Sequence, residues 1–183
     1  MDPYLRSSLV AAFRWFDPGP HSDHLVSDVS GWWRSPTVLA SVGPALAALF
    51  GEASPTVVVA PEVTGFVVGP LVAVALGVGF APAVKDSGDR RLADDVTWGR
   101  TPVDYRGREL RLGVRSRQLD AADRVLVVDD WVATGAQVRA LYEVIAARRA
   151  VAVGCAAIVA ACPPEAASEL RVRSLLTVGD LAP

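Results

Sequence analysis

The sequence predicts a single α/β domain, residues 1–183, with a mainly parallel, twisted sheet flanked by helices. Three observations support this. Short β-branched and apolar runs alternate with helix-like segments, a pattern typical of parallel sheets with crossover helices. One apolar run leads directly into paired acids and a glycine turn that opens a helix, as at the ligand-binding edge of such sheets. Finally, 183 residues suit one domain of the usual size, roughly 100 to 200 residues.

The expected elements follow in chain order. One helix is predicted where apolar side chains recur on one face, at Leu39, Val42, Leu46, Leu49 and Phe50. A second helix is expected after Ala133–Gln137, because Val138, Leu141 and Ile145 recur at i, i+3 and i+7. Strands are predicted over Thr56–Ala60, Val78–Lys85, Glu109–Arg115, Arg124–Val128, Val151–Ala161 and Arg171–Val178, and a short helix or connection over Pro163–Leu170.

The uncharged segment Val63–Val84 is long enough to be mistaken for a membrane span. Its prolines and glycines divide it instead into a helix and a strand. Pro70 is expected in the first turn of that helix, and Gly77 is expected in the turn that follows it. The segment Met1–Phe16 contains Asp2, Arg6 and Arg14 and so has no secretory signal pattern. No membrane partner is expected.

Composition excludes other classes of function. Lys plus Arg is 18 and Asp plus Glu is 20, so the surface is no basic nucleic-acid platform. Cys155 and Cys162 have neither CxxC nor metal-ligand spacing, which favours buried thiols in a reducing cytoplasm. His21 and His24 have no further apparent ligands, so no zinc site is expected. Phosphate-loop, dinucleotide-binding and nucleophile-elbow motifs are missing from the sequence.

The segment Arg124–Ala136, RVLVVDDWVATGA, is the most informative for chemistry. Its apolar strand ends in Asp129 and Asp130, and the Thr/Gly turn that follows opens a helix whose free N–H groups favour a phosphate. Ionised carboxylates accept hydrogen bonds from vicinal hydroxyls and stabilise nearby positive charge. A ribose 5-phosphate meets both demands. The structural alternative is that an Asp after a strand forms a turn or caps a helix.

This segment resembles the signature of the type I phosphoribosyltransferases, D-D-x-x-x-T-G-G-T after a hydrophobic strand. The resemblance implies that Asp129 and Asp130 hold the ribose and that the loop Ala133, Thr134, Gly135, Ala136 and Gln137 binds the 5-phosphate of phosphoribosyl pyrophosphate. Ala136 and Gln137 stand where many members have Gly and Thr. Backbone donors survive this change, while one hydroxyl contact is lost or replaced by the Gln137 amide.

Val57–Lys85 is similar to the pyrophosphate loop and R-G-F-x-x-G-P helix of adenine phosphoribosyltransferases. Thr64 replaces the Arg expected before Gly65, and a neutral hydroxyl binds phosphate less firmly than a bidentate guanidinium. Glu62 takes the loop's acidic position. The resemblance therefore implies that Thr64, Gly65, backbone N–H groups and Lys85 bind pyrophosphate. Lys85 is equally well read as a solvated residue at a strand end.

The resemblance also implies a hood over the base, at about 1–36, and a mobile lid loop, at about 86–105. Asp104 and Tyr105 match the acidic-Tyr pair near the end of the lid, with Asp104 in the catalytic set and Tyr105 in the substrate-binding set. Ser27 replaces an Arg of the hood pattern. Trp131, inside the motif, either shapes the base pocket or packs below the loop, while Trp32 and Trp33 are expected in the core or an interface.

The implied function is Mg²⁺-dependent transfer of phosphoribose from phosphoribosyl pyrophosphate to a nucleobase, with an adenine-type purine favoured. Mg²⁺ is expected to be bound mainly by substrate oxygens, with no dedicated protein metal site. The resemblance also implies a cytoplasmic homodimer in nucleotide salvage. The alternative is a non-catalytic protein that senses phosphoribosyl pyrophosphate or a nucleotide, which the loss of Arg at Thr64 favours.

Overall fold

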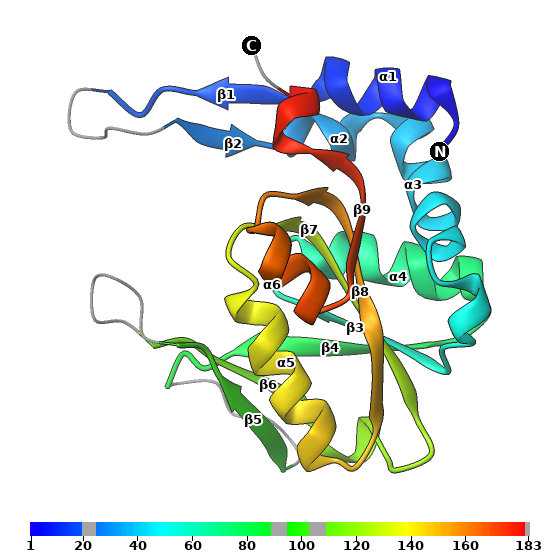
Figure 1. Cartoon of the computed structure of the whole chain (residues 1–183), viewed down its shortest axis with the longest axis vertical. Coiled ribbons are helices and arrows are strands. Elements are labelled where there is room, and N and C mark those ends of the chain that lie inside the picture. The colour runs from blue at the N-terminus through cyan, green and yellow to red at the C-terminus, as the bar shows by residue number, and fades with distance from the viewer. Residues whose placement is uncertain (20–24, 89–94, 103–108, 182–183) are drawn as a thin grey trace.

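The computed structural model describes residues 1–19, 25–88, 95–102 and 109–181. Its centre is a seven-stranded sheet with the order β5-β6-β4-β3-β7-β8-β9 (Figure 1). Five of these strands are parallel: β3 (Val57–Pro61), β4 (Gly79–Lys85), β7 (Arg124–Val132), β8 (Val151–Ala160) and β9 (Val172–Thr177). The remaining two, β5 (Val96–Arg100) and β6 (Arg111–Arg115), form an antiparallel edge. The predicted single α/β domain with a mainly parallel sheet is confirmed.

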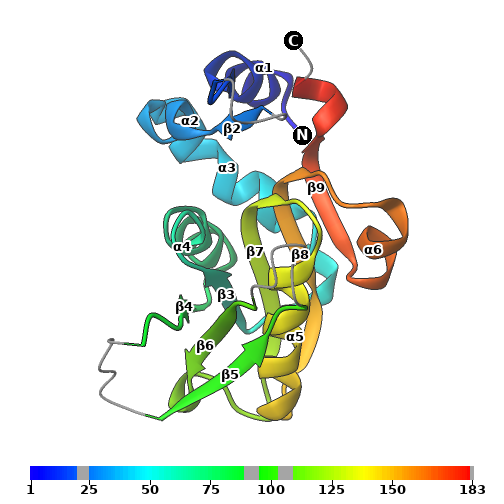
Figure 2. The same cartoon turned by 90° about the vertical axis from the view of Figure 1, so that its left-hand side faces the viewer.

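Helices cover both faces of the sheet (Figure 2). Val58 and Leu126 contribute to one core with α3 (Pro36–Ala48) and α4 (Gly65–Leu76), whereas Val59 and Val127 contribute to a second core with α5 (Ala136–Ala147). This alternation follows from the two-residue period of strands that are buried on both faces. The short helix α6 (Pro164–Glu169) connects β8 to β9, as the sequence predicts.

The described residues of the expected hood, 1–19 and 25–36, lie at one end of the sheet (Figure 1). They contain α1 (Pro3–Ala12), the antiparallel pair β1 (Arg14–Phe16) and β2 (Val26–Asp28), and α2 (Ser30–Arg34). Both views show the final turn of the described chain, η3 (Val178–Leu181), beside α1 (Figures 1 and 2). Two further short turns, η1 (Gly51–Ala53) and η2 (Ser116–Gln118), connect elements of the main body. Trp32 is fully buried and its Nε1 donates to the Leu9 carbonyl, which confirms its expected core role.

Residues 86–105 do not form one continuous lid loop, so that expectation is wrong in part. Val96–Arg100 is a strand that pairs along its full length with β6. Val96, Thr97 and Trp98 have high β propensity, which outweighs the absence of a clear alternation. Gly99 lets this strand approach α5, since a Cβ there would lie 1.9 Å from the Ala140 carbonyl oxygen. The glycines and scattered charges of residues 86–105 weaken the sequence pattern that would otherwise have predicted this short edge strand.

Pro70 is also placed differently from expectation. The helix α4 begins at Gly65, so Pro70 lies inside the helix and not in its first turn. Its ring nitrogen has no hydrogen to donate to the carbonyl one turn earlier, a defect that helices tolerate when packing compensates. Gly77 ends α4 in the left-handed conformation, with φ of 68°, as expected. No helix among the described residues is long and apolar enough to cross a bilayer.

Candidate functional site

The paired acids lie at the carboxyl end of β7, which is longer than predicted and includes both of them. Asp129 is only 5% exposed, and its Oδ1 accepts a hydrogen bond of 2.9 Å from the Asp130 backbone N–H. Burial raises the pKa of Asp129 well above its ordinary value, and the neighbouring Asp130 carboxylate raises it further. Burial also raises the pKa of Asp130, which is half-buried. The pair therefore favours a ligand that brings hydroxyl donors or positive charge.

The turn between β7 and α5 has the geometry of an anion loop. Gly135 adopts φ of 78° and directly precedes the first residue of α5, so backbone N–H groups of the first turn point outward along the helix dipole. The Thr134 hydroxyl accepts a hydrogen bond of 3.3 Å from the Ala136 N–H. A cavity of about 70 Å³ lies at this turn, and its lining includes Asp129, Trp131 and the predicted loop Ala133–Gln137. One acid and the whole predicted phosphate loop therefore share a single cavity.

A core side chain lies directly beneath Gly135. A Cβ at Gly135 would lie 2.5 Å from Cδ1 of Leu170, which is only 3% exposed. The Tyr142 hydroxyl donates a hydrogen bond of 2.6 Å to the Leu170 carbonyl, which fixes this residue against α5. Leu170 and Tyr142 thus set the floor of the loop. No motif in the sequence indicates this support, because Leu170 and Tyr142 lie outside the loop segment and follow ordinary core spacing.

The pyrophosphate half of the predicted site follows β3, the strand beside β7. The β3–β7 boundary is the point from which the chain leaves in opposite directions, and open α/β sheets bind ligands at such a point. Gly65 opens α4 close to the strand end, since a Cβ there would lie 3.1 Å from Ala60 Cβ. Thr64 is the N-cap of α4, and its hydroxyl makes no capping hydrogen bond within the described chain. The hydroxyl is thus not used to cap the helix.

Lys85 is the last residue of β4, on the other side of β3. Its positive charge acts on both acids, lowering the pKa of Asp129 and of Asp130 against the larger effect of burial. The structure therefore brings the cation predicted from the sequence to the electrostatic neighbourhood of the acids. Pyrophosphate binding by Lys85 stays a prediction.

Trp131 connects the acid pair to the hood. Its ring stacks on Phe13 with centroids 5.9 Å apart and an interplanar angle of 16°. The Trp15 ring meets it edge-on at 5.9 Å and 84°. Trp131 lines the loop cavity as well. Packing against Phe13 and Trp15 at the boundary with the hood is neither of the two expected roles and had no sequence signal, and a role in the base pocket stays a prediction.

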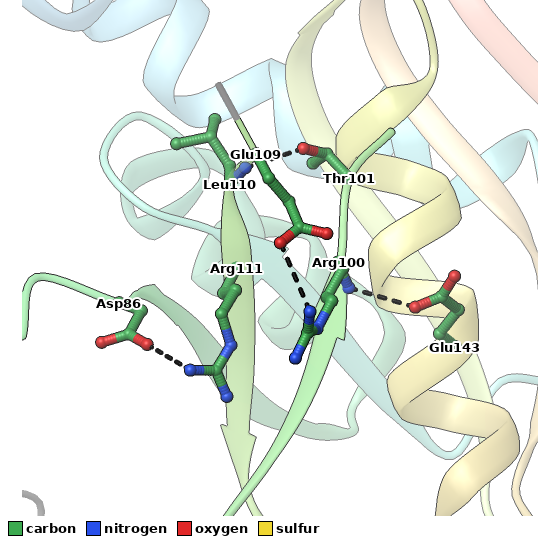
Figure 3. Close-up of polar contacts among 7 residues, drawn as sticks. All are labelled: Asp86, Arg100, Thr101, Glu109, Leu110, Arg111 and Glu143. Atoms are coloured by element: carbon green, nitrogen blue, oxygen red, sulfur yellow. Dashed lines mark hydrogen bonds and ion pairs between the residues drawn. The ribbon is translucent and has the colours of Figure 1, made fainter. Parts of the chain in front are cut away.

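The end of the β5–β6 hairpin that joins its connecting segment is held by polar contacts on both sides (Figure 3). The Glu143 carboxylate of α5 accepts a hydrogen bond of 3.0 Å from the Arg100 backbone N–H, and the Arg100 guanidinium contacts Glu109 at 3.5 Å (Figure 3). Leu110 N–H donates to the Thr101 hydroxyl at 2.9 Å, and Arg111 pairs with Asp86 at 2.8 Å (Figure 3). Asp104 and Tyr105, predicted site residues, lie outside the described residues.

A larger cavity, of about 460 Å³, lies away from these residues, between η1, α6 and β9. Its two arginines have structural partners. Arg171 donates to the Ala152 carbonyl and Arg173 to the Leu49 carbonyl, each at 2.6 Å. Cavity size alone therefore does not identify the site. The carboxylate and the anion loop lie at the smaller cavity beside Asp129.

Metal ligands are sparse in the described part of the chain. No group of three or more His, Cys, Asp or Glu side chains comes together there. Asp129 and Asp130 offer hard oxygen ligands of the kind that Mg²⁺ prefers, but they fill only part of an octahedral shell. A magnesium ion at these acids would need oxygens from a substrate and water.

Comparison with known proteins agrees with this geometry. Residues 34–178 match the family model described as phosphoribosyl transferase domain. Adenine phosphoribosyltransferase from Thermoanaerobacter pseudethanolicus is 19% identical, with a TM-score of 0.83 over 94% of this chain and 99% of that chain. The Leishmania donovani enzyme is 24% identical, with a TM-score of 0.81 over 97% and 81%. The Giardia lamblia enzyme, complexed with 9-deazaadenine, is 25% identical, with a TM-score of 0.80 over 94% and 97%.

Proposed function

This chain belongs to the phosphoribosyl transferase domain family, and from that premise we propose that it transfers phosphoribose from phosphoribosyl pyrophosphate to a purine in nucleotide salvage. The observation that carries the proposal is the cavity that joins Asp129 to the loop Ala133–Gln137. It provides the Asp129 carboxylate for ribose hydroxyls and backbone donors for a phosphate within one small site.

In the proposed reaction, a nitrogen of the base forms a bond to C1 of the ribose while the bond from C1 to the pyrophosphate oxygen breaks. Pyrophosphate leaves with the bonding electrons, and the attacking nitrogen loses its proton. Positive charge develops on the ribose ring, and carboxylates fixed beside it stabilise that charge. We assign this role to Asp129 and Asp130, while Asp104 and Tyr105 stay proposed partners from the sequence resemblance.

Lys85 and the N-terminal end of α4, at Thr64 and Gly65, would hold the pyrophosphate. The support is the effect of Lys85 on both acids and the closeness of Gly65 to the end of β3. Mg²⁺, when bound, would neutralise pyrophosphate charge and favour its departure. Substrate oxygens and the acid pair are its proposed ligands.

A purine of the adenine type is the proposed acceptor. The support is the fold likeness to adenine phosphoribosyltransferases, among them one from Saccharomyces cerevisiae complexed with adenine. Trp131, beside the acids, supplies an aromatic side chain at the boundary with the hood, where a flat base would meet it. A cytoplasmic location is proposed from the two free thiols, Cys155 and Cys162.

The second candidate is a protein that binds phosphoribosyl pyrophosphate without turning it over. One observation favours it: Thr64 offers a neutral hydroxyl where the resembled pyrophosphate loop has an Arg. Loss of a bidentate cation at a leaving group weakens charge stabilisation in the transition state.

A direct assay separates the two candidates. The protein is incubated with Mg²⁺, phosphoribosyl pyrophosphate and each of adenine, hypoxanthine, guanine, xanthine, uracil and orotate, and pyrophosphate release is followed. Release with a purine supports transfer, and the Asp129→Asn, Asp130→Asn double variant should then lose about a hundredfold or more in turnover. Binding of phosphoribosyl pyrophosphate without release from any base would instead support the sensing protein.

We also propose a homodimer that uses the exposed face of α4. This face is apolar and uncharged, with Val74 81% exposed and Val63, just before the helix, 74% exposed. Exposed apolar patches of this kind mark interfaces. Light scattering should give the mass of two 19.3 kDa chains, and the Val67→Asp, Val74→Asp variant should give one. A monomeric wild-type chain would contradict the proposal.

A further inference from the structure

The last turn of the described chain is tied to the first helix. The Arg6 guanidinium of α1 donates to Asp180 Oδ1 of η3 at 2.6 Å, across a separation of 174 residues. The second carboxylate oxygen of Asp180 accepts from the Thr177 N–H at 2.7 Å and from its hydroxyl at 2.9 Å. These bonds lower the pKa of Asp180 to about 2, the Thr177 N–H contributing most. The carboxylate that receives Arg6 is therefore charged and oriented.

A second contact runs from the same turn toward the acid pair. Trp15 Nε1 in β1 donates a hydrogen bond of 2.8 Å to the Leu181 carbonyl. The Trp15 ring in turn packs edge-on against Trp131, the residue after Asp130. A continuous series of contacts thus connects Leu181 to Trp15, to Trp131 and to the end of β7.

Within the hood, the β1–β2 pair needs such external contacts to hold one orientation, whereas α1 and Trp32 pack into the main core. The hood sheet has only two strands, β1 and β2, and an isolated two-stranded pair is marginally stable in water. It extends away from the main body of the fold (Figure 1). The described contacts with η3 and Trp131 fix the end of β1 that lies nearest the site.

We propose that the C-terminal turn Val178–Leu181 positions the acceptor base by holding Trp15 against Trp131. Arg6, Trp15 and Asp180 are positioning residues in this proposal, since they act through the hood and Trp131. The proposal rests on the proposed function, because it concerns the base half of that site. Trp131 also lines the cavity of the loop Ala133–Gln137, but the loop backbone is supported from below by Leu170 at Gly135 and has no described hydrogen bond to the hood.

The first test is Trp15→Phe in the full chain, which keeps an aromatic ring and removes the N–H that bonds Leu181. Loss of one hydrogen bond of ordinary strength corresponds to about a three- to tenfold rise in KM for adenine. KM for phosphoribosyl pyrophosphate should stay within about twofold, because Trp15→Phe keeps a ring against Trp131 and the phosphate loop is supported by Leu170, not by η3. Equal changes in both KM values, or a lower Tm with neither KM changed, would assign Trp15 a purely structural role.

The ion pair is tested by Arg6→Met and by its conservative partner Arg6→Lys. Arg6→Met should raise KM for adenine by up to about fivefold, the range of exposed ion pairs, and Arg6→Lys should recover most of the loss. The matched control is Asp123→Asn, which removes an exposed carboxylate bonded to Thr56 at the opposite end of the sheet. An effect of the control as large as that of Arg6→Met would overturn the assignment.

Hydrogen exchange of the same variants separates this proposal from the proposed function. In Trp15→Phe, amides of α1 and β1 should exchange faster than in the wild type, while those of β7 and α5 stay unchanged. If the wild-type chain releases no pyrophosphate, the proposed transfer reaction is refuted. The positioning role is then decided by two other measurements: hydrogen exchange, and adenine binding followed by quenching of tryptophan fluorescence. Unchanged exchange in α1 and β1 would refute it in either case.

Discussion

Replacing Gly135 with Ala tests whether the loop between β7 and α5 is a rigid anion site. The substitution has two costs. Gly135 has φ of 78°, a conformation that costs a non-glycine residue about 1 kcal/mol or somewhat more. The new Cβ would also lie 2.5 Å from Leu170 Cδ1, so one of them must move by about 1 Å to reach ordinary contact at about 3.5 Å.

Leu170 has little freedom to move, because it is buried and its carbonyl is held by Tyr142. Overpacking in such a core typically costs about 1 to 3 kcal/mol. Gly135→Ala should therefore lower the free energy of unfolding by about 2 to 4 kcal/mol. Because the loop backbone must shift to relieve the contact, affinity for phosphoribosyl pyrophosphate should fall at least about tenfold, which equals about 1.4 kcal/mol.

Urea unfolding measures the first effect and isothermal titration calorimetry with the magnesium salt of phosphoribosyl pyrophosphate measures the second. The matched control is Gly77→Ala, at φ of 68° with no atom within 4 Å of the added Cβ. Gly77→Ala should lower the free energy of unfolding only by the cost of the left-handed backbone conformation, about 1 kcal/mol, and it should leave ligand binding unchanged. If Gly135→Ala costs no more than Gly77→Ala, or binds phosphoribosyl pyrophosphate as tightly as the wild type, the reasoning about this loop is refuted.

Three further predictions concern the acids, the cation and the hairpin. The pKa of Asp129 is raised in the folded state. Between the ordinary carboxyl pKa and this raised pKa, the native protein therefore binds more protons than the unfolded chain. The free energy of unfolding should fall as the pH rises through that range. Asp129→Asn should flatten that dependence and raise Tm at pH 8 more than at pH 4; an equal change at both would contradict a raised pKa. Lys85→Met should weaken product inhibition by pyrophosphate about tenfold or more, whereas unchanged inhibition would return Lys85 to the solvated interpretation. Glu143→Ala removes the acceptor of the Arg100 N–H and should cost about 0.5 to 1.5 kcal/mol in urea unfolding, with faster exchange at the Arg100 amide as the specific sign.

The sequence predicts the centre of the parallel sheet well because β3, β7 and β8 are largely buried apolar runs. Val57–Pro61 and Val151–Ala160 are close to the predicted ranges, since strands covered on both faces carry an unbroken hydrophobic signal. The same reasoning fails at Val96–Arg100. That strand is the outermost strand of the sheet and pairs with a neighbouring strand on one edge only. Its stability comes from pairing with β6 and from the close approach of Gly99 to α5.

The candidate site also contains parts that the sequence predicts and parts that it does not. Asp129 and the loop Ala133–Gln137 were predictable as a group, because they lie in one continuous segment of chain. The nearness of Lys85 to the acids depends on the strand order, in which only β3 lies between β4 and β7. Leu170 and Phe13 lacked any motif, since each acts through shape at a contact between distant segments.

The two halves of the candidate site differ in what holds them, and this bears on specificity for the base. The ribose-phosphate half is held by backbone geometry within β7, the loop and α5, so its form is fixed locally. The boundary with the hood depends on side chains, with Trp131 held between Phe13 and Trp15, and Trp15 bonded in turn to Leu181. If this boundary meets the base as proposed, substitutions in these aromatic residues should change the surface offered to a base and leave the phosphate loop in place. We therefore expect the choice of acceptor to be changeable without loss of phosphoribosyl pyrophosphate binding, and the separate KM values of Trp15→Phe for adenine and for phosphoribosyl pyrophosphate test this.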